Sequence, residues 1–409
     1  MQTREILSFI LGSALTVSMF TGCQSEDNND NNAVETVTPF ERVAVIDGGD
    51  WATANTIADT IAEYVDSTDE STALGYPTNW IVGGDKDENG ATIAAADRIL
   101  EIPKMYDDNG DGTAETAHKI PVIELCNSAY ATQATGTGRF HGPALPCEVS
   151  VHYDADAGKI YVDMLNADAI FSLFFTDLSV TDKASLKTVA TTVKSEIAGM
   201  VEAALDDASV SYTASDLGLG KAYPITESMD GAAYINPYVV YSYKLDDDTA
   251  IPTGMDTIIA QEIIDIMGGT DATGLTSHTN VPGLSSGALW RSGRPAPLPI
   301  PGVKIVEACS PKYAKMATAM GAEYVTALPC EIGVFIDNDD AEGKTLKITF
   351  LNPTFMFNVM FADALEALSG DEMVTYSTLP DIVFADLKAI VNAAIDQYNQ
   401  TAGVDVIVK

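Results

Sequence analysis

A duplicated cysteine segment constrains this chain more than any other feature. The first copy carries Cys126 and Cys147, and the second carries Cys309 and Cys330, with Leu-Pro directly before the later cysteine of each pair. In both copies the second cysteine follows the first by 21 positions. A match of this kind in two places indicates a tandem duplication. The chain is therefore expected to fold as two related modules.

Hydrophobic periodicity predicts the same order of elements, β-α-β-α-β-β-α, in both halves. The predicted strands are 40–46, 120–125, 147–153 and 159–165 in the first half, and 238–245, 303–308, 330–336 and 344–351 in the second. Helices are predicted from about residues 56 and 257, directly after Cys126 and Cys309, and over 186–205 and 384–398. We therefore expect an α+β protein built of two homologous α/β sandwich modules.

The expected domain organisation has four parts. Residues 1–22 are predicted to be a lipoprotein signal peptide, and 23–38, which are acidic and amide-rich, a disordered tether. The first module is expected over 39–213 and the second over 230–409. The first copy is longer between its Thr-Asn pair and its first cysteine, which predicts an acidic-loop insertion at about 80–118.

The N-terminal segment predicts export. Arg4 precedes an apolar run that ends at Phe20, and this run is short for a membrane-spanning helix. Gly22-Cys23 resembles the lipobox of bacterial lipoproteins, in which the cysteine carries the lipid. Plain secretion and an uncleaved anchor are the alternatives. We expect a cell-envelope protein, lipid-anchored at the outer membrane or its periplasmic face and contacting the membrane through that lipid only.

The charge balance excludes one class of partner. The chain has 22 Lys and Arg against 59 Asp and Glu, a net charge of −37. Phosphate backbones would be repelled, so nucleic-acid binding is not expected. The cysteine count agrees with export, because one cysteine lies at the lipobox and the other four form two matched pairs.

The second cysteine segment resembles a known family. Cys309-Ser-Pro311-Lys-Tyr-Ala314, followed by Leu-Pro-Cys330, is similar to the bacterial domain of unknown function 302, and the first copy matches except that it lacks the proline. The resemblance implies a compact α+β fold that commonly pairs into dimers. Two copies in one chain would then be a fused pseudo-dimer inside a monomer. The resemblance implies no reaction.

The four paired cysteines support several kinds of chemistry. Cys126 and Cys309 precede predicted helices, where amide hydrogens and the helix dipole stabilise a thiolate. One alternative is a structural disulfide in each half, and another is a redox-active or sulfur-carrying dithiol. A third is a soft-metal or haem-iron site, and a fourth is free buried thiols. The residues that could assist a metal site are Glu124, Glu148, His152, Glu307 and Glu331.

Two acidic loops have the spacing of calcium ligands, with oxygen-bearing residues at alternate positions and a glycine next. The predicted ligands are Asp85, Asp87, Asn89, Asp107, Asn109 and Asp111. Neither loop has a bidentate glutamate at its twelfth position, and solvated turns have the same composition. Calcium is the cofactor that these loops suggest.

No catalytic constellation is evident, since the histidines do not recur between the copies and there is no phosphate loop. Tyr130, Tyr313, Glu124 and Glu307 recur and are candidate ligand-binding residues, although core packing also explains the tyrosines. Aromatic runs at 170–175 and 355–361 predict either a ligand groove or the seam between the halves. We expect a non-enzymatic protein that binds a small ligand or partner; the alternative is a thiol-dependent redox or sulfur-transfer protein.

Overall fold

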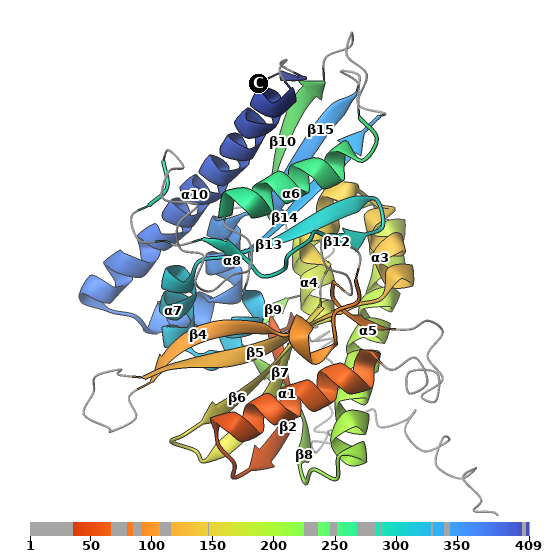
Figure 1. Cartoon of the computed structure of the whole chain (residues 1–409). Helices are drawn as coiled ribbons and strands as arrows, with labels where there is room; N and C mark the ends of the chain where they lie inside the picture. The colour runs from red at the N-terminus through yellow and green to blue at the C-terminus, as the bar shows by residue number, and fades with distance from the viewer. Residues whose placement is uncertain are drawn as a thin grey trace, which may run out of the picture. The chain divides into compact units, whose positions relative to one another are not determined.

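The first module, residues 36–224, is built on an antiparallel sheet that has 7 strands over its described residues (Figure 1). The strand order is β3-β5-β6-β7-β2-β8, and β4 pairs with the same edge of β5 as β3 does. The strands are β2 (Phe40–Asp47), β3 (Ile81–Val82), β4 (Leu100–Tyr106), β5 (Thr116–Cys126), β6 (Cys147–Asp154), β7 (Lys159–Leu165) and β8 (Thr213–Leu219). A separate short pair joins β1 (Thr36–Val37) to β9 (Tyr223–Pro224).

The second module, residues 236–408, repeats this sheet in the order β11-β13-β14-β15-β10-β16, with β12 against β13. Its strands are β10 (Tyr238–Leu245), β11 (Arg291–Ser292), β12 (Leu298–Ile300), β13 (Val303–Cys309), β14 (Cys330–Asp337), β15 (Thr345–Leu351) and β16 (Ile407–Val408). The matching order shows that β3, β5 and β6 correspond to β11, β13 and β14. The two modules are therefore homologous in topology.

The helices follow the same plan in both modules. In the first they are α1 (Trp51–Asp66), η1 (Ala96–Arg98), α3 (Ser128–Thr135), η2 (Arg139–Ala144), α4 (Ala167–Phe174) and α5 (Val180–Asp207). In the second they are α6 (Met255–Met267), α7 (Pro311–Met320), η4 (Ala322–Ala327), α8 (Pro353–Met360), α9 (Ala362–Ala367) and α10 (Gly370–Ala402).

The structure is a computed structural model, and it describes residues 36–66, 80–84, 91–106, 116–145, 147–224, 236–245, 252–267, 283–285, 288, 290–328, 330–338, 344–402 and 406–408. Within these ranges the predicted α+β class and the two-module organisation are confirmed. The predicted helix starts are also found: Asn127 caps α3 through its side chain, and Ser310 caps α7, which has Pro311 in its first turn.

Three features differ from the sequence predictions. Thr36–Val37, which fell within the predicted tether, forms strand β1. The region predicted as a loop insertion contributes β3 and β4 to the sheet. The aromatic runs form two helices, α4 and α8, because Asn166 and Asn352 cap them and Pro353 opens the second.

In each module one face of the sheet is covered by its own long helices, and the other face by a short helix of the other module. In the first module α1 and α5 pack together on one face, and α6 and α10 do the same in the second. The opposite face receives the short helix of the other module, since η2 packs on β13, β14 and β15 while η4 packs on β5, β6 and β7. The modules therefore exchange equivalent segments.

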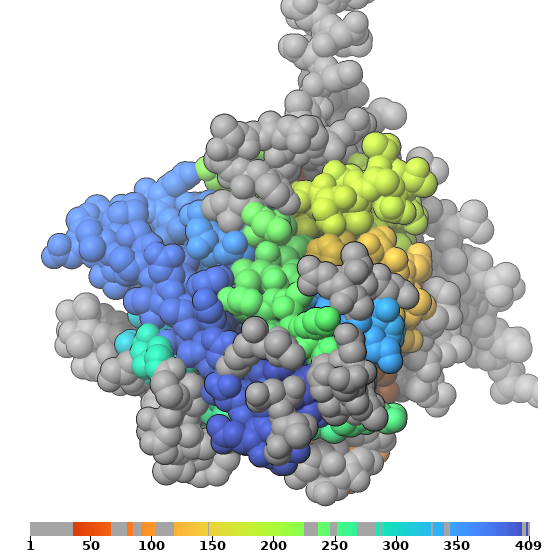
Figure 2. Space-filling view, turned by 90° about the horizontal axis from the view of Figure 1, so that it is seen from above, coloured from red at the N-terminus to blue at the C-terminus, as the bar shows by residue number. Residues whose placement is uncertain are grey.

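Particular contacts fix this exchange. Arg139 in η2 donates to the carbonyl of Ile336 at 2.8 Å, and Thr349 donates to the carbonyl of Phe140 at 3.2 Å. In the space-filling view the green strand β10 lies between blue α10 and the orange segment that contains η2 (Figure 2), which agrees with the ring contact of Phe140 and Tyr238 at 5.5 Å. The large apolar core accordingly contains residues of both modules.

Among the described residues, no helix is both long enough and apolar enough to cross a membrane.

Candidate functional site

Two pairs of glutamates lie at the seam between the modules. Glu124 on β5 is directly opposite Glu148 on β6, and Glu307 on β13 is directly opposite Glu331 on β14. Side chains that are opposite each other in an antiparallel pair lie on the same face of the sheet. In both modules this is the face that receives the other module. The repeated sequence thus places four carboxylates in one interface.

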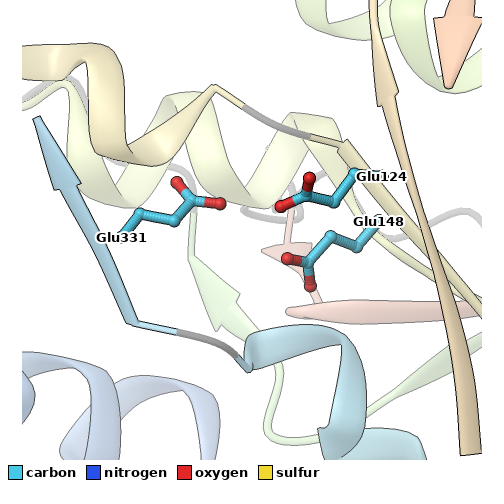
Figure 3. A group of neighbouring side chains, drawn as sticks. All are labelled: Glu124, Glu148 and Glu331. Atoms are coloured by element: carbon cyan, nitrogen blue, oxygen red, sulfur yellow. The ribbon is translucent and has the colours of Figure 1, made fainter. Parts of the chain in front are cut away.

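Three of these carboxylates converge from both modules, as Figure 3 shows for Glu124, Glu148 and Glu331. One oxygen from each lies within 4.8 Å of an oxygen of the other two. Their exposed fractions are 1% for Glu124, 3% for Glu148 and 5% for Glu331. Close carboxylates with so little contact with water repel one another strongly unless a cation or protons neutralise them.

Arg294 supplies one positive charge to the cluster. It follows β11, is 4% exposed, and donates from Nε to Glu124 Oε2 at 3.0 Å and also to Glu307. Its Nη1 donates to the carbonyl of Arg98 in the first module at 3.0 Å. Burial alone would lower the pKa of Arg294, but Glu307 and Glu124 raise it overall, so this guanidinium stays charged.

Adjacent glycines make room for these carboxylates. Gly83 and Gly293 are equivalent, because each donates its amide to the carbonyl of the glutamate on the next strand, Glu124 or Glu307. A Cβ atom at Gly83 would lie 3.0 Å from Glu124 Oε2, and one at Gly293 would lie 2.5 Å from Glu307 Oε2. Larger residues at either position would displace the carboxylates.

The arginine leaves most of the negative charge uncompensated. The buried oxygens Glu124 Oε1, Glu148 Oε2, Glu307 Oε2 and Glu331 Oε2 have no hydrogen-bond partner among the described residues. Burial first, and then the neighbouring carboxylates, raise the pKa of Glu148 and of Glu331 well above the usual range. Burial also raises the pKa of Glu307, against the effect of Arg294. The cluster therefore has a strong affinity for protons or another cation.

A cavity of about 30 Å³ adjoins the cluster. Glu148 and Glu331 line it together with equivalent residues of the two modules, such as Ile170 of α4 and Met356 of α8. Phe174 of α4 contacts Phe355 of α8, with ring centroids 5.0 Å apart. The aromatic runs therefore form the seam, as the sequence predicted in one of its two interpretations, and they also wall a small cavity.

The four paired cysteines have free thiols, so the structural-disulfide alternative is not found. Cys147 is opposite Leu125 rather than Cys126, and Cys330 is opposite Ala308 rather than Cys309, so the cysteines of each pair are offset by one position. The two thiols of each pair nevertheless lie near each other, since burial and then Cys126 raise the pKa of Cys147, and burial and then Cys309 raise the pKa of Cys330.

Burial also disfavours the thiolate form of these cysteines. It raises the pKa of Cys126, Cys309 and Cys330 to about 12, and it raises the pKa of Cys147 as well. Desolvation thus outweighs the effect of the helix terminus. His152 does not join the thiols, because it lies five positions along β6 from Cys147 and its Nδ1 is 3.8 Å from Asp163.

The recurring tyrosines lie in two separate sites, one in each module. Tyr130 and Trp80 donate to the carboxylate of Glu196 on α5, both at 2.8 Å. Tyr313 and Trp290 donate to Asp386 on α10, at 3.1 and 2.8 Å. These matched triads anchor the closing helix of each module to the segment that follows the first cysteine. Neither the tryptophans nor the acids were selected from the sequence, although both recur in it.

Several predicted site residues lie outside the described residues. They are Cys23 and the six calcium-ligand candidates, Asp85, Asp87, Asn89, Asp107, Asn109 and Asp111. Of the residues that are described, the structure brings Glu124 and Glu307 together, and it adds Glu148, Glu331 and Arg294 to them. The recurrence of a glutamate after each Leu-Pro-Cys was the available signal for two of these. Arg294 has no counterpart in the other copy and gave no signal.

Fold and site together define a class: an α+β protein of two fused homologous modules that enclose a carboxylate cluster. The sequence model of the family described as "Domain of unknown function DUF302" matches residues 113–204 and 296–375, one segment in each module. The chain therefore has two segments that match this family model, in agreement with a tandem duplication.

Solved structures show remote similarity. A DUF302 protein from Bacillus stearothermophilus is 14% identical over 40% of this chain and 96% of that chain, with a TM-score of 0.24. DynU16, from the dynemicin biosynthetic locus, is 11% identical over 87% and 99%, with a TM-score of 0.17. The di-domain ARO/CYC StfQ from the steffimycin biosynthetic pathway is 10% identical over 89% and 99%, with a TM-score of 0.20. No curated protein matches the chain.

Proposed function

We propose that this protein binds a small cationic ligand, a hard divalent metal ion, between its two modules. The observation that carries the proposal is the convergence of Glu124, Glu148 and Glu331, whose buried oxygens include three without a hydrogen-bond partner. Buried polar atoms in folded proteins are almost always paired, so unpaired carboxylate oxygens that face one another point to a missing positive charge.

The donor set selects the kind of metal. Carboxylate oxygens are ligands of Mg²⁺, Mn²⁺ and Ca²⁺, and they suit soft metals poorly. The adjoining cavity of about 30 Å³ has room for roughly two waters, since one water needs about 10–15 Å³. Three carboxylates and two waters supply five oxygens, or six if one carboxylate is bidentate, which is closer to the octahedral preference of Mg²⁺ and Mn²⁺ than to the larger coordination shell of Ca²⁺.

Protons compete with the metal for the same oxygens, which gives the site a defined pH dependence. The pKa values of Glu148 and Glu331 are raised in the folded state, so the folded metal-free protein binds protons more tightly than the unfolded chain. Its stability therefore falls as pH rises from about the usual glutamate value towards the raised folded value. Stabilisation by a metal should increase over the same window, because the metal needs the deprotonated oxygens.

The test is a titration of chelator-treated protein with Mn²⁺ at pH 7.5 and pH 5.5, followed by electron paramagnetic resonance and by thermal unfolding. A metal concentration of about 100 times the Kd stabilises the folded state by about 2.7 kcal/mol. We expect this gain at pH 7.5 and a smaller one at pH 5.5. Glu148→Gln and Glu331→Gln should each remove most of it, because they delete one charged ligand.

Two controls separate this site from others. Glu63→Gln, on an exposed position of α1, should bind Mn²⁺ like the natural protein. Asp87→Asn combined with Asp111→Asn disrupts both predicted calcium loops, and it should also leave the signal of the cluster intact. Binding that survives Glu148→Gln and Glu331→Gln but is lost in the loop variant would contradict the proposal, as would the absence of any binding at pH 7.5.

We also propose a location for the protein in the cell. The resemblance of Gly22-Cys23 to a lipobox supports a lipid-anchored envelope protein, in which the acidic segment links the lipid to the folded modules. Cys23→Ser should then prevent fatty-acid labelling of the chain in a bacterial host. The thiol-redox alternative is less favoured, because burial raises the pKa values of the four thiols.

A further inference from the structure

A second cavity, of about 50 Å³, lies in the second module and is lined by three sulfur-bearing side chains. The thiols of Cys309 and Cys330 and the thioether of Met356 all line it, and most of the remaining wall is apolar, as with Phe357 and Phe361. Cys309 and Cys330 come from the neighbouring strands β13 and β14, so both line the cavity from the sheet. Sulfur donors gathered in an apolar space suit soft metal ions.

This sulfur cavity adjoins the carboxylate cavity, and Leu351 and Met356 line both. The donors nevertheless differ. Cys330 and Glu331 are successive residues of β14, so their side chains leave the strand on opposite faces. The thiols line the sulfur cavity and the carboxylates of Glu148 and Glu331 line the other, so the two adjoining cavities offer chemically different donors.

The equivalent place in the first module lacks two features. Met356 on α8 corresponds to Ile170 on α4, since they lie at matched positions in the cavity that the modules share. Arg291 is the register partner of Cys309, and the matching partner of Cys126 is Ile81. At these two described positions the first pair of cysteines thus has neither a third sulfur nor a cation.

Arg291 matters because metal binding by thiols leaves a negative charge. Its positive charge lowers the pKa of Cys309, although burial dominates and the net effect is a raised pKa. A monovalent metal ion bound by two thiolates carries a net charge of −1, which is costly in an apolar site without compensation. Arg291 lies where it offsets that charge.

We propose that Cys309, Cys330 and Met356 form a binding site for one soft monovalent metal ion, such as Cu(I). In the binding step each S–H bond is broken, two metal–sulfur bonds form, and two protons leave to solvent for each ion bound. No electron is transferred. The thioether of Met356 adds a third, neutral ligand. The site is independent of the proposed divalent site and needs only the second module's donors.

The experiment is an anaerobic titration of the full chain, in a Cys23→Ser background, with Cu(I) in competition with a chromogenic Cu(I) chelator. We expect one tightly bound ion per chain and the release of about two protons per ion in weakly buffered solution. Cys309→Ser and Cys330→Ser should each abolish tight binding. Cys126→Ser, the matched control in the first module, should bind like the parent.

Met356→Ile provides a second variant, because it installs the residue that the first module uses at this position. It should weaken Cu(I) binding about 10-fold or more with little effect on folding, which circular dichroism checks. Two tight ions per chain, equal losses from Cys126→Ser and Cys309→Ser, or complete retention of Cu(I) by the chelator would overturn the proposal. Cys126→Ser and Cys309→Ser should keep the Mn²⁺ response, so failure of one proposal is distinguishable from failure of the other.

Discussion

Replacement of Arg294 by methionine is the sharpest test of the electrostatics at the seam. The natural guanidinium is 4% exposed and donates to Glu124, to Glu307 and to the carbonyl of Arg98. Methionine keeps much of the apolar volume but removes the charge and all the donors. It leaves a cluster of buried carboxylates with no compensating cation from the described residues.

The expected cost at neutral pH is about 3–5 kcal/mol, the usual result of removing one partner of a buried ion pair. The loss should be smaller at pH 5, because protonation neutralises the carboxylates that methionine leaves unpaired. The pKa of Glu307 is already raised in the natural protein by burial, so removal of Arg294 moves it further in the same direction. We expect the penalty at pH 5 to be less than half of that at pH 7.

The assay is urea unfolding at both pH values in the presence of a chelator, with the midpoint and slope measured for each variant. Arg294→Met combined with Glu124→Gln and Glu307→Gln should recover most of the loss at pH 7, because the triple variant removes the unpaired charges as well. An equal penalty at the two pH values, or a triple variant no more stable than the single one, would refute the electrostatic reasoning.

Two further predictions follow from local geometry. Asn166 caps α4 and Asn352 caps α8, because their side chains accept from the amides of Asp168 and Thr354. Alanine at either position should lower the free energy of unfolding by about 1 kcal/mol. The control Asn358→Ala, at an exposed position within α8, should change it much less. Cys126, Cys147, Cys309 and Cys330 are free, with pKa values raised by burial, so in a Cys23→Ser background a thiol reagent should react slowly with the native protein at pH 8. After unfolding without reductant it should count all four, whereas a count near zero would show that both pairs are oxidised.

Most of the strands and helices could be predicted from the sequence, because they depend on local patterns of apolar and polar residues. Strands β7 and β10 lie where the apolar runs predicted them, and the other predicted strands differ at their ends by a few residues. The helices predicted directly after Cys126 and Cys309 are also found, and the polar residues Asn127 and Ser310 cap them. Short edge strands such as β3 and β11 gave no periodic signal, because two residues are too few to show alternation.

The site was harder to predict because it belongs to the interface. Periodicity places Glu124 on a strand, but it does not reveal that this face receives η4 of the other module. A glutamate within an apolar strand was therefore visible only as a possible helper of the cysteines. The matched spacing of the cysteines suggested a disulfide in each half, but spacing along the chain does not determine cross-strand register. In the structure the cysteines of each pair are offset by one position and have free thiols.

Arg294 shows what the fusion of two modules allows. Its equivalent in the first module is Gly84, because Gly83 and Gly293 make the same amide contact one residue earlier. A Cβ atom at Gly84 would lie 2.8 Å from Cδ of Arg294, so a long side chain at Gly84 would compete with Arg294 for the same space. A dimer of two identical modules would have to place either two arginines or two glycines here. Two arginines would collide, and two glycines would leave all four glutamates without their arginine. Within one chain the two positions can differ, so a single guanidinium can hold Glu124 and Glu307 while Glu148 and Glu331 remain available to a cation.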